Sequence, residues 1–481
     1  MIHQIFLFLL LSIASFNLLI PFISQHGGFL RNYLLLIASM LFFLGVILLD
    51  WLFLQKISVS LYLFSIGKYQ FALSVELYGL VFLNLLACLW IVALLYTSKY
   101  LELNNENENS SLFIFFMNLC VSLGVLVALS ANLFTMFIAY EMLTLATIPL
   151  IIYKKSDNPV IWTALYKYLK ILMTSSLVLF LPAIIIIYSK VGNGNFIAAG
   201  FVENYFGNSQ SIILFLMFIF GISKAALYPL CGWLPAAMVA NYPTSALLHA
   251  VVVVKVGLFC LFKICTHVFG LSYLYSIFAH HNWIVIFPAV TVIYSSVKAL
   301  SVNNIKAILA YSTINGLAIS LLVAFMFTKK SMSLAILHMI SHSVTKICLF
   351  YCIGIFYSFR KFYNLQDISG LGRQVPIVGF IFVLASLSLI GIPPFGGFIS
   401  KFLIIAEAIR QKQILIVFIT GISGLLSSLY ILKINTILFS NNFNDTTKIC
   451  YVPLSMNVAI TICAVIMTCF ALVYKLINPL L

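Results

Sequence analysis

Residues 331–357 read SMSLAILHMISHSVTKICLFYCIGIFY and carry ionisable side chains at a spacing of four residues, at His338, His342 and Lys346. The stretch is longer than the roughly 20 apolar residues that cross a bilayer as one helix. Side chains four residues apart lie on the same face of a helix, one above the other. The stretch therefore predicts a membrane-spanning helix with a titratable stripe, which is typical of a proton relay.

The composition of the whole chain favours a membrane protein. Of its 481 residues, 63% are hydrophobic and 8% are charged, whereas a soluble domain carries about 25% charged residues. Lipid must therefore be the solvent for much of the surface. The net charge is +15, but the basic residues are spread thinly and form no run. This pattern excludes a nucleic-acid-binding protein and fits the preference of membrane-protein loops for lysine and arginine.

Fourteen apolar stretches are expected to span the membrane, which predicts an all-α polytopic membrane protein. The division between the fourth and fifth spans rests on the short break Ser130, Ala131 and Asn132. The first span is taken as a helix of the protein and not as a removed signal peptide. The predicted spans are residues 2–24, 29–54, 71–97, 112–131, 132–153, 163–189, 211–232, 243–265, 283–300, 306–327, 331–357, 376–403, 412–438 and 452–477.

An even number of spans places both termini on the same side of the membrane. Loop lysines and arginines number 9 on that side, with Lys263, Lys330 and Arg410 among them, and 11 on the other side. Because cytoplasmic loops carry the excess of positive charge, the termini are expected outside. The compartment expected is the bacterial inner (plasma) membrane.

Two spans contain helix breakers in related places. Residues 224–235 read KAALYPLCGWLP, and residues 391–397 read GIPPFGG. Proline removes a helical hydrogen bond, and the freed carbonyl groups are tolerated in a bilayer only against protein or a wet cavity. Such a pair of interrupted helices indicates a transport site. The helix-breaking prolines are Pro229, Pro235, Pro393 and Pro394.

The two interrupted segments lie roughly 165 residues apart, which suggests an internal repeat. A similar offset relates Leu258–Ile264 (LFCLFKI) to Ser428–Ile434 (SLYILKI). Chance similarity among apolar helices is the alternative explanation.

The charged residues inside apolar sequence are the candidates for function. The only acid well inside an apolar run is Glu141, whereas Asp50, Glu76 and Glu407 fall near span ends, where they can reach headgroups. The buried lysines are Lys224, Lys255, Lys346 and Lys401. One charge at the centre of a membrane helix costs about 2.5–3.5 kcal/mol, so five of them indicate a function. The alternative is a structural salt bridge between Glu141 and one lysine, with the other lysines reaching the interface.

Lysine suits proton transfer because burial disfavours its charged form, while a nearby carboxylate favours it. At about 4 Å and an effective dielectric constant near 20, that attraction is about 4 kcal/mol. Movement of Glu141 relative to Lys224 could therefore load or release a proton. His249 lies six residues before Lys255 and does not share its helix face, so its participation is left open.

Several motifs resemble those of the antiporter-like family, which comprises Mrp-type cation/proton antiporter subunits A and D and complex I subunits L, M and N. The resemblance covers roughly residues 70 to 440. The motifs are YEM at Glu141, KAALYPLCGWLP (224–235), PTSALLHAVVVVKVG (243–257), NNIKAILAYSTI (303–314), HMISHSVTKICLF (338–350), ISGLGRQVPIVGF (368–380) and GIPPFGGFISKF (391–402).

The resemblance implies two inverted five-helix repeats, each with a broken helix, around a central hydrophilic axis. It also implies that Glu141 pairs with Lys224, that Lys255 is the central carrier and that Lys401 ends the path, with His342 and Lys346 as relays. The domains expected are a single transmembrane domain 1–481, with N-terminal helices in 1–111, the first repeat in 112–265, the second repeat in 283–438 and a last helix in 439–481.

The motifs also depart from the family pattern. Ala236 and Asn304 stand where the family usually has aspartate. Lys401 argues against an M-type subunit, and the chain length argues against the L subunit and the full-length A subunit. The KAALYPL and KVG segments favour a D-like Mrp subunit, whereas SALLHA is more similar to A and L subunits.

Four functions are compatible with these residues to different degrees. The first is a proton- or cation-translocating subunit of a multi-subunit Mrp-type antiporter, and the alternative is a proton-pumping N- or M-like subunit of NADH–quinone oxidoreductase. A scaffold that transports nothing and a carrier of organic solutes rank below them. No nucleotide fingerprint, metal spacing or cluster ligation occurs in the sequence, so no cofactor or metal is expected, and no redox step in this chain. The partners expected are other membrane subunits, lipid, protons and Na⁺ or K⁺.

Overall fold

The computed structural model describes residues 2–23, 28–106, 109–153, 158–278, 282–440 and 451–477. Nearly all of these residues are helical, and among them one antiparallel pair of strands forms the sheet. The chain divides into two compact units. The first unit comprises Met1–Leu94, Asn109–Ala225 and Val251–Asn282, and the second comprises Leu95–Glu108, Ala226–Ala250 and Trp283–Leu481.

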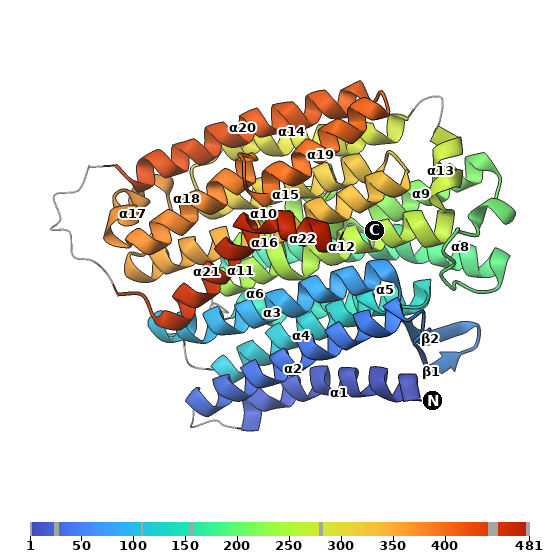
Figure 1. The fold of residues 1–481 in the computed structure, drawn as a ribbon, viewed down its shortest axis with the longest axis horizontal. Coiled ribbons are helices and arrows are strands. Elements are labelled where there is room, and N and C mark those ends of the chain that lie inside the picture. The colour runs from blue at the N-terminus through green and yellow to red at the C-terminus, as the bar shows by residue number, and fades with distance from the viewer. Residues whose placement is uncertain are drawn as a thin grey trace. The chain divides into compact units, whose positions relative to one another are not determined.

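In the first unit, α1 packs against α2 and α4, and strand β2 packs beside α5 (Figure 1). The last residues of α3 belong to the second unit. The elements are α1 (Ile2–Ile23), α2 (Gly28–Leu54), β1 (Ser60–Ile66), β2 (Tyr69–Ser74), α3 (Leu77–Leu103), α4 (Ser110–Ala128), α5 (Leu133–Ala146), α6 (Ile148–Ile152), α7 (Pro159–Ser175), the π-helical η1 (Ser176–Phe180), α8 (Leu181–Val191), the 3-10 turns η2 (Val202–Asn204) and η3 (Ser223–Ala225), α9 (Asn208–Gly221), α12 (Val253–Lys263), the π-helical η7 (Ile264–Phe269) and α13 (Leu271–Phe278).

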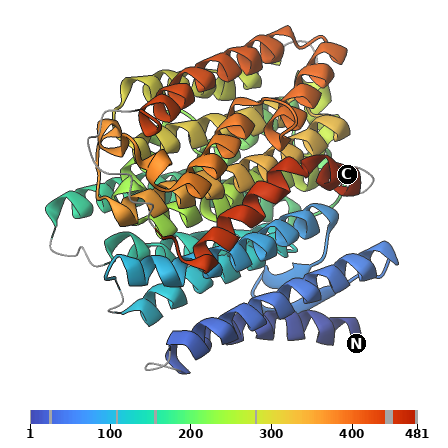
Figure 2. The same ribbon diagram turned by 60° about the vertical axis from the view of Figure 1, so that its left-hand side comes forward.

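In the second unit, α14, α15 and α20 lie side by side, and α16 packs against α15, α18 and α19 (Figures 1 and 2). The elements are the 3-10 turns η4 (Leu230–Gly232), η5 (Ala237–Val239), η8 (Trp283–Val285) and η9 (Leu365–Ile368), the π-helical η6 (Leu247–Val251), and the helices α10 (Trp233–Ala236), α11 (Tyr242–Ala246), α14 (Ile286–Ser301), α15 (Ile305–Ala324), α16 (Lys329–Phe359), α17 (Leu371–Gln374), α18 (Pro376–Ile390), α19 (Gly396–Arg410), α20 (Ile414–Leu438), α21 (Leu454–Thr468) and α22 (Phe470–Ile477).

Ten helical stretches among the described residues are long and apolar enough to cross a membrane, or eleven if the bent pair Leu365–Gln374 and Pro376–Ile390 is one span. Shorter apolar helices stand where three further spans were predicted, at Phe6–Phe22, Asn208–Gly221 and Leu454–Thr468. The prediction of an all-α membrane protein is therefore confirmed, whereas the number of fourteen spans is not.

The break predicted at residues 130–132 is present. Helix α4 ends at Ala128 and α5 begins at Leu133. The side chain of Asn132 accepts a hydrogen bond from the backbone N–H of Thr135 at 2.8 Å, which caps the first turn of α5. A polar cap inside an otherwise apolar sequence thus separates the fourth span from the fifth.

Both predicted interrupted helices are interrupted in the structure. In the first unit α9 ends at Gly221, and the short turn η3 follows. In the second unit α18 ends at Ile390, and α19 starts only at Gly396. Gly391 between them has a φ of +97°, which glycine adopts without the steric cost of a Cβ atom. The chain therefore leaves the helix at a defined residue and exposes the last carbonyl groups of α18.

The third predicted span begins too early. Residues 71–74 belong to a hairpin of β1 and β2, and α3 begins at Leu77. Gly67 occupies the turn of this hairpin with a φ of +59°. An apolar run by itself does not distinguish a strand from a helix. The glycine in the turn was therefore the feature of the sequence that could have indicated the hairpin.

Three of the lysines that were counted in loops to predict the orientation lie outside the described residues. They are Lys154, Lys155 and Lys448. The last predicted span, 452–477, is described as two helices, α21 and α22.

Candidate functional site

Lys224 is held at the interrupted helix of the first unit. It lies in η3, directly after α9, and is 0% exposed. Its ammonium group donates a hydrogen bond to the backbone carbonyl of Tyr140 and lies 3.4 Å from the centroid of the Tyr140 ring. The backbone N–H of Lys224 donates to the Tyr140 hydroxyl at 3.2 Å. A carbonyl dipole and a ring face therefore compensate the charge in place of water.

Glu141 follows Tyr140 on α5 and brings the opposite charge to the same place. Both of its carboxylate oxygens are buried, and the charge of Lys224 and the hydroxyl of Ser176 act on them. Lys224 and Glu141 are thus electrostatic neighbours, while the ammonium group itself contacts Tyr140. The carboxylate can therefore favour the protonated form of Lys224 without a direct ion pair to the amine.

Lys255 lies on α12 and is 0% exposed. Helix α12 packs closely on the segment that carries Lys224, because residue 257 is a glycine. A Cβ atom at Gly257 would lie 2.4 Å from the backbone of Lys224 and 2.9 Å from its Cβ. The glycine therefore permits a close approach of the two lysine-bearing segments.

In the second unit, α16 carries the predicted stripe. The ring centroids of His338 and His342 lie 6.1 Å apart at an interplanar angle of 20°. His338 Nδ1 forms a hydrogen bond with the Ser400 hydroxyl at 2.9 Å. Lys346 donates to the hydroxyl of Ser312 and, at 3.2 Å, to the carbonyl of Leu309. The three ionisable residues are therefore stacked along one helix, as the spacing of four residues predicted.

The side chain of Lys401 binds at the break between α18 and α19. Its ammonium group donates to the carbonyl groups of Leu389 at 2.8 Å and Ile390 at 2.9 Å. These are the last carbonyl groups of α18 and have no partner within the helix, because the helix stops there. A cation at the C-terminal end of a helix is also favoured by the helix dipole.

A small polar cavity in the second unit joins these groups. His338, His342 and Lys401 border it together with Ser312, the hydroxyl partner of Lys346. The cavity has a volume of about 20 Å³, which is room for about one water molecule. Further hydroxyl and amide groups in its wall come from Asn315, Ser341, Thr345, Ser388 and Ser427, and Gly316, Ile319, Leu389 and Gly397 line the rest. This arrangement can pass protons between imidazole, hydroxyl and amine groups over short distances.

His249 lies elsewhere in the second unit. It is in the π-helical turn η6 and is 0% exposed. Its ring centroid lies 5.1 Å from that of Phe350. His249 does not border the cavity described above.

The sequence-based assignment of Lys263 was wrong. Lys263 was counted as a loop residue, but it lies on α12 and its side chain is 1% exposed. Its ammonium group lies 3.1 Å from the carboxylate of Glu76, which also lies 3.4 Å from Nε2 of His267. Glu76 is therefore an ion-pair partner within the bundle and not a headgroup contact. The signal available in the sequence was the spacing of Lys263 and His267, four residues apart on one helix.

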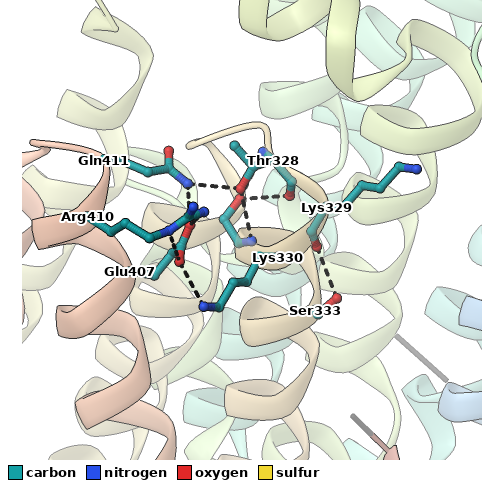
Figure 3. Close-up of polar contacts among 8 residues, drawn as sticks. Thr328, Lys329, Lys330, Ser333, Glu407, Arg410 and Gln411 are labelled. Atoms are coloured by element: carbon teal, nitrogen blue, oxygen red, sulfur yellow. Dashed lines mark hydrogen bonds and ion pairs between the residues drawn. The ribbon is translucent and has the colours of Figure 1, made fainter. Parts of the chain in front are cut away.

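Glu407 is a second acid that the sequence placed at a span end. Its side chain is 0% exposed and is surrounded by donors at the end of α19 and the start of α16 (Figure 3). Arg410 donates at 2.5 and 2.9 Å, Gln411 at 2.6 Å, and Lys330 lies 3.3 Å away. Gln411 also donates to the Thr328 hydroxyl at 3.0 Å. This group of residues ties the far end of the interrupted helix to the helix that carries the histidines.

The sequence and the fold have relatives among known proteins. Residues 130–427 match the family described as "NADH:quinone oxidoreductase/Mrp antiporter, TM". The antiporter subunit mnhA2 of Staphylococcus aureus is 26% identical over 401 residues, which are 79% of this chain and 48% of that protein. The chain thus spans about half the length of the curated relatives it matches.

Two solved structures share the fold. A chain of the Mrp complex from Dietzia sp. DQ12-45-1b superposes with a TM-score of 0.82 and 18% identity, covering 98% of this chain and 95% of that one. A chain of the membrane-bound sulfane sulfur reductase, an archaeal respiratory membrane complex, also gives a TM-score of 0.82, with 20% identity over 99% of this chain and 96% of that one.

Proposed function

Because this chain belongs to the NADH:quinone oxidoreductase/Mrp antiporter transmembrane family, we propose that it is the ion-translocating subunit of a multi-subunit Mrp-type cation/proton antiporter. Protons, and Na⁺ or K⁺, are the proposed substrates, and other membrane subunits are the proposed partners. The membership rests on 298 matched residues out of 481, since the match runs from residue 130 to 427.

The observation that carries the proposal is the environment of the buried amines. Lys224 and Lys346 are both 0% exposed, and neutral carbonyl and hydroxyl oxygens accept hydrogen bonds from them. A neutral acceptor can remain in place when the amine gives up its proton, whereas a salt-bridged carboxylate would be left as a bare buried charge. Buried amines in such surroundings are suited to gain and lose protons.

The proposed roles follow the two units. In the first unit Glu141 controls the charge of Lys224, and Lys255 on the adjoining helix α12 carries the proton further. In the second unit His338, His342 and Lys346 relay the proton, and Lys401 at the helix break is the terminal group. Pro229, Pro235, Pro393 and Pro394 keep the two helices interrupted. The boundaries 112–265 and 283–438 are proposed for the two inverted repeats, with the N-terminal helices before them and the last helix after them.

The alternative is a proton-pumping N- or M-like subunit of an NADH–quinone oxidoreductase. The family description includes both kinds of complex, and one structural relative belongs to a respiratory membrane complex. The antiporter is preferred because the mnhA2 relatives are described as antiporter subunits. Those relatives are A-type subunits, so the D-like assignment made from the KAALYPL and KVG segments stays a prediction.

The protein is an integral membrane protein, and the bacterial plasma membrane is its proposed location. The termini are proposed to lie outside. Removal of Lys263 from the loop count leaves 8 basic residues on the terminal side against 11 on the other, because 9 − 1 = 8. The corrected count favours the same orientation.

The proposal is tested with the purified complex in proteoliposomes that contain a trapped pH indicator. A Na⁺ or K⁺ gradient is applied with and without NADH and quinone. The antiporter assignment predicts a pH change that depends on the cation gradient and needs no NADH. Proton movement that requires NADH and quinone and does not depend on either cation gradient would assign the chain to an NADH–quinone oxidoreductase.

A further inference from the structure

A second group of ionisable residues lies in the first unit, apart from Glu141 and Lys224. It consists of Glu76, just before α3, Lys263 on α12 and His267 in η7. One carboxylate oxygen of Glu76 lies 3.1 Å from the Lys263 ammonium and 3.4 Å from Nε2 of His267. A single oxygen atom thus faces two groups that can each carry a proton.

The hydrogen bonds of His267 locate a proton in this group. The hydroxyl of Thr266 donates to the carbonyl of Phe262 at 2.8 Å, so its oxygen is left to accept from His267 Nδ1, 2.7 Å away. Nδ1 therefore carries the hydrogen, and Nε2 faces the Glu76 carboxylate. A lone pair on Nε2 would repel that carboxylate, so a proton between them, on either Nε2 or the carboxyl, is the favourable state.

The exposure of the three side chains decreases from the edge of the unit inward. It is 21% for Glu76, 10% for His267 and 1% for Lys263. The Glu76 side chain is therefore partly accessible and the Lys263 amine is not, while the carboxylate oxygen that faces Lys263 and His267 is itself buried. The Lys263 ammonium is further held by the backbone carbonyl of Ser130 and by the ring of Phe196, whose centroid lies 4.4 Å away.

The other groups that face this cluster are neutral. Ser74, at the end of β2, donates to the second carboxylate oxygen of Glu76 at 3.2 Å. The ring of Tyr78, from α3, lies 6.1 Å from the His267 ring. Cys260 lies one turn before Lys263 on α12, and the charges of both Lys263 and Lys224 act on it. The ion-pairing groups of the cluster are therefore Glu76, Lys263 and His267.

The cluster shares helix α12 with Lys255, the proposed proton carrier. Lys255 and Lys263 are eight residues apart on α12, which is a rise of about 12 Å and a rotation of about 80°. Both side chains thus lie on one side of α12, and both are buried.

We propose that Glu76, His267 and Lys263 form a proton-exchange site between water and α12, a function that rests on the translocation proposed above. Once the Lys263 ammonium has given its proton to an acceptor on the Lys255 side of α12, a hydronium ion protonates the Glu76–His267 pair, and the proton that the pair already shares moves to the neutral Lys263 amine. One proton enters and one is passed on, no bond between heavy atoms changes, and no electron is transferred.

The test compares Glu76→Gln and His267→Gln with the wild-type complex in the proteoliposome assay, from pH 5.5 to 8.5. Glutamine keeps hydrogen-bonding capacity and approximate size in both cases but does not titrate. Glu102→Gln is the matched control, because Glu102 is an exposed acid paired with Lys99 at 2.7 Å on the surface. Assembly is checked by co-purification of the partner subunits.

We expect both variants to lose at least about ten-fold in rate, a modest share of what a general acid–base group contributes. We also expect the pH dependence of the rate within the range of about pH 5 to 8, in which histidine changes its charge, to flatten in both variants, while Glu102→Gln follows the wild type. If Glu76→Gln fails to assemble, His267→Gln decides the result.

Two outcomes overturn different parts of the account. Variants that keep the wild-type pH profile, whatever their rate, assign the cluster a purely structural role and refute the exchange site alone. A wild-type complex that moves no protons in response to Na⁺ or K⁺ refutes the proposed function, and the exchange site with it.

Discussion

Gly316 on α15 lies directly against the imidazole of His342. A Cβ atom at residue 316 would lie 2.3 Å from Nε2 of that ring, closer than real Cβ contacts allow. The ring is the far end of a side chain that can rotate, so the fold can accommodate the methyl group by moving His342 away from its place at the cavity.

We therefore expect Gly316→Ala to assemble normally and to lower cation-dependent proton movement by about ten-fold or more, since a displaced relay group costs a large share of proton transfer. The measurement is the initial rate of pH change in proteoliposomes. Gly421→Ala on α20 is the control, because nothing lies within 4 Å of a Cβ atom at that position. An unchanged rate in Gly316→Ala would show that the position of His342 does not matter.

The sorting of charges into spans and loops identified most of the residues that the structure places in polar clusters. Lys224, Lys346 and Lys401 were found because each lies within an apolar run. Lys263 was missed because the predicted span ended at residue 265, whereas the helix continues through the π-helical η7 to Phe269. A change of helix type leaves no mark on hydropathy, so the end of a span is its least predictable part.

At the scale of elements, the residues around Glu407 fasten α19 to the first turn of α16. Burial raises the pKa of the Glu407 carboxyl, but hydrogen bonds from Arg410, Gln411 and Lys330 outweigh this effect and hold the pKa below its ordinary value of 4.5. Because the pKa of the folded state is depressed, the stabilisation is present above about pH 4.5 and is lost as the pH falls through the lower, folded value.

We expect Glu407→Gln to lower the Tm of the purified complex by about 2–4 °C between pH 5 and 8, which corresponds to about 1 kcal/mol in a domain of this size. The difference from the wild type should narrow as the pH falls below 4.5. Lys329→Gln is the control, because this neighbouring lysine points away from Glu407 (Figure 3). A Tm difference that grows towards acid pH would contradict the depressed pKa.

The interrupted helices were predictable from sequence, whereas the hairpin was not. Proline and glycine pairs mark the breaks near Pro229 and Pro394, because each removes or relaxes a backbone hydrogen bond. Strands β1 and β2 consist mainly of apolar residues and lie just before α3, and Gly67 and Lys68 between the strands signal the turn. Local composition therefore fixed the breaks, while strand pairing depends on contacts that composition does not record.

At the scale of the whole molecule, each unit contains a lysine amine next to an interrupted helix, buried at Lys224 and partly buried at Lys401. Lys224 follows the end of α9 in the first unit, and Lys401 holds the end of α18 in the second. The internal repeat suggested by the offset of roughly 165 residues between the two breaks stays a prediction. At Lys401 the break itself supplies the carbonyl groups that compensate the ammonium, whereas Lys224 is compensated by the carbonyl and ring of Tyr140 on α5.

The central claim is that buried lysines carry the transported proton, and replacement of Lys255 by alanine tests it most directly. Wild-type and Lys255→Ala complexes are compared in proteoliposomes for pH change driven by a Na⁺ or K⁺ gradient, with subunit co-purification as the check of assembly. We predict that the assembled variant loses at least 90% of the exchange, as loss of a proton-transfer group costs about ten-fold or more. Normal exchange in the intact Lys255→Ala complex would contradict the claim and leave the chain as a scaffold for other subunits.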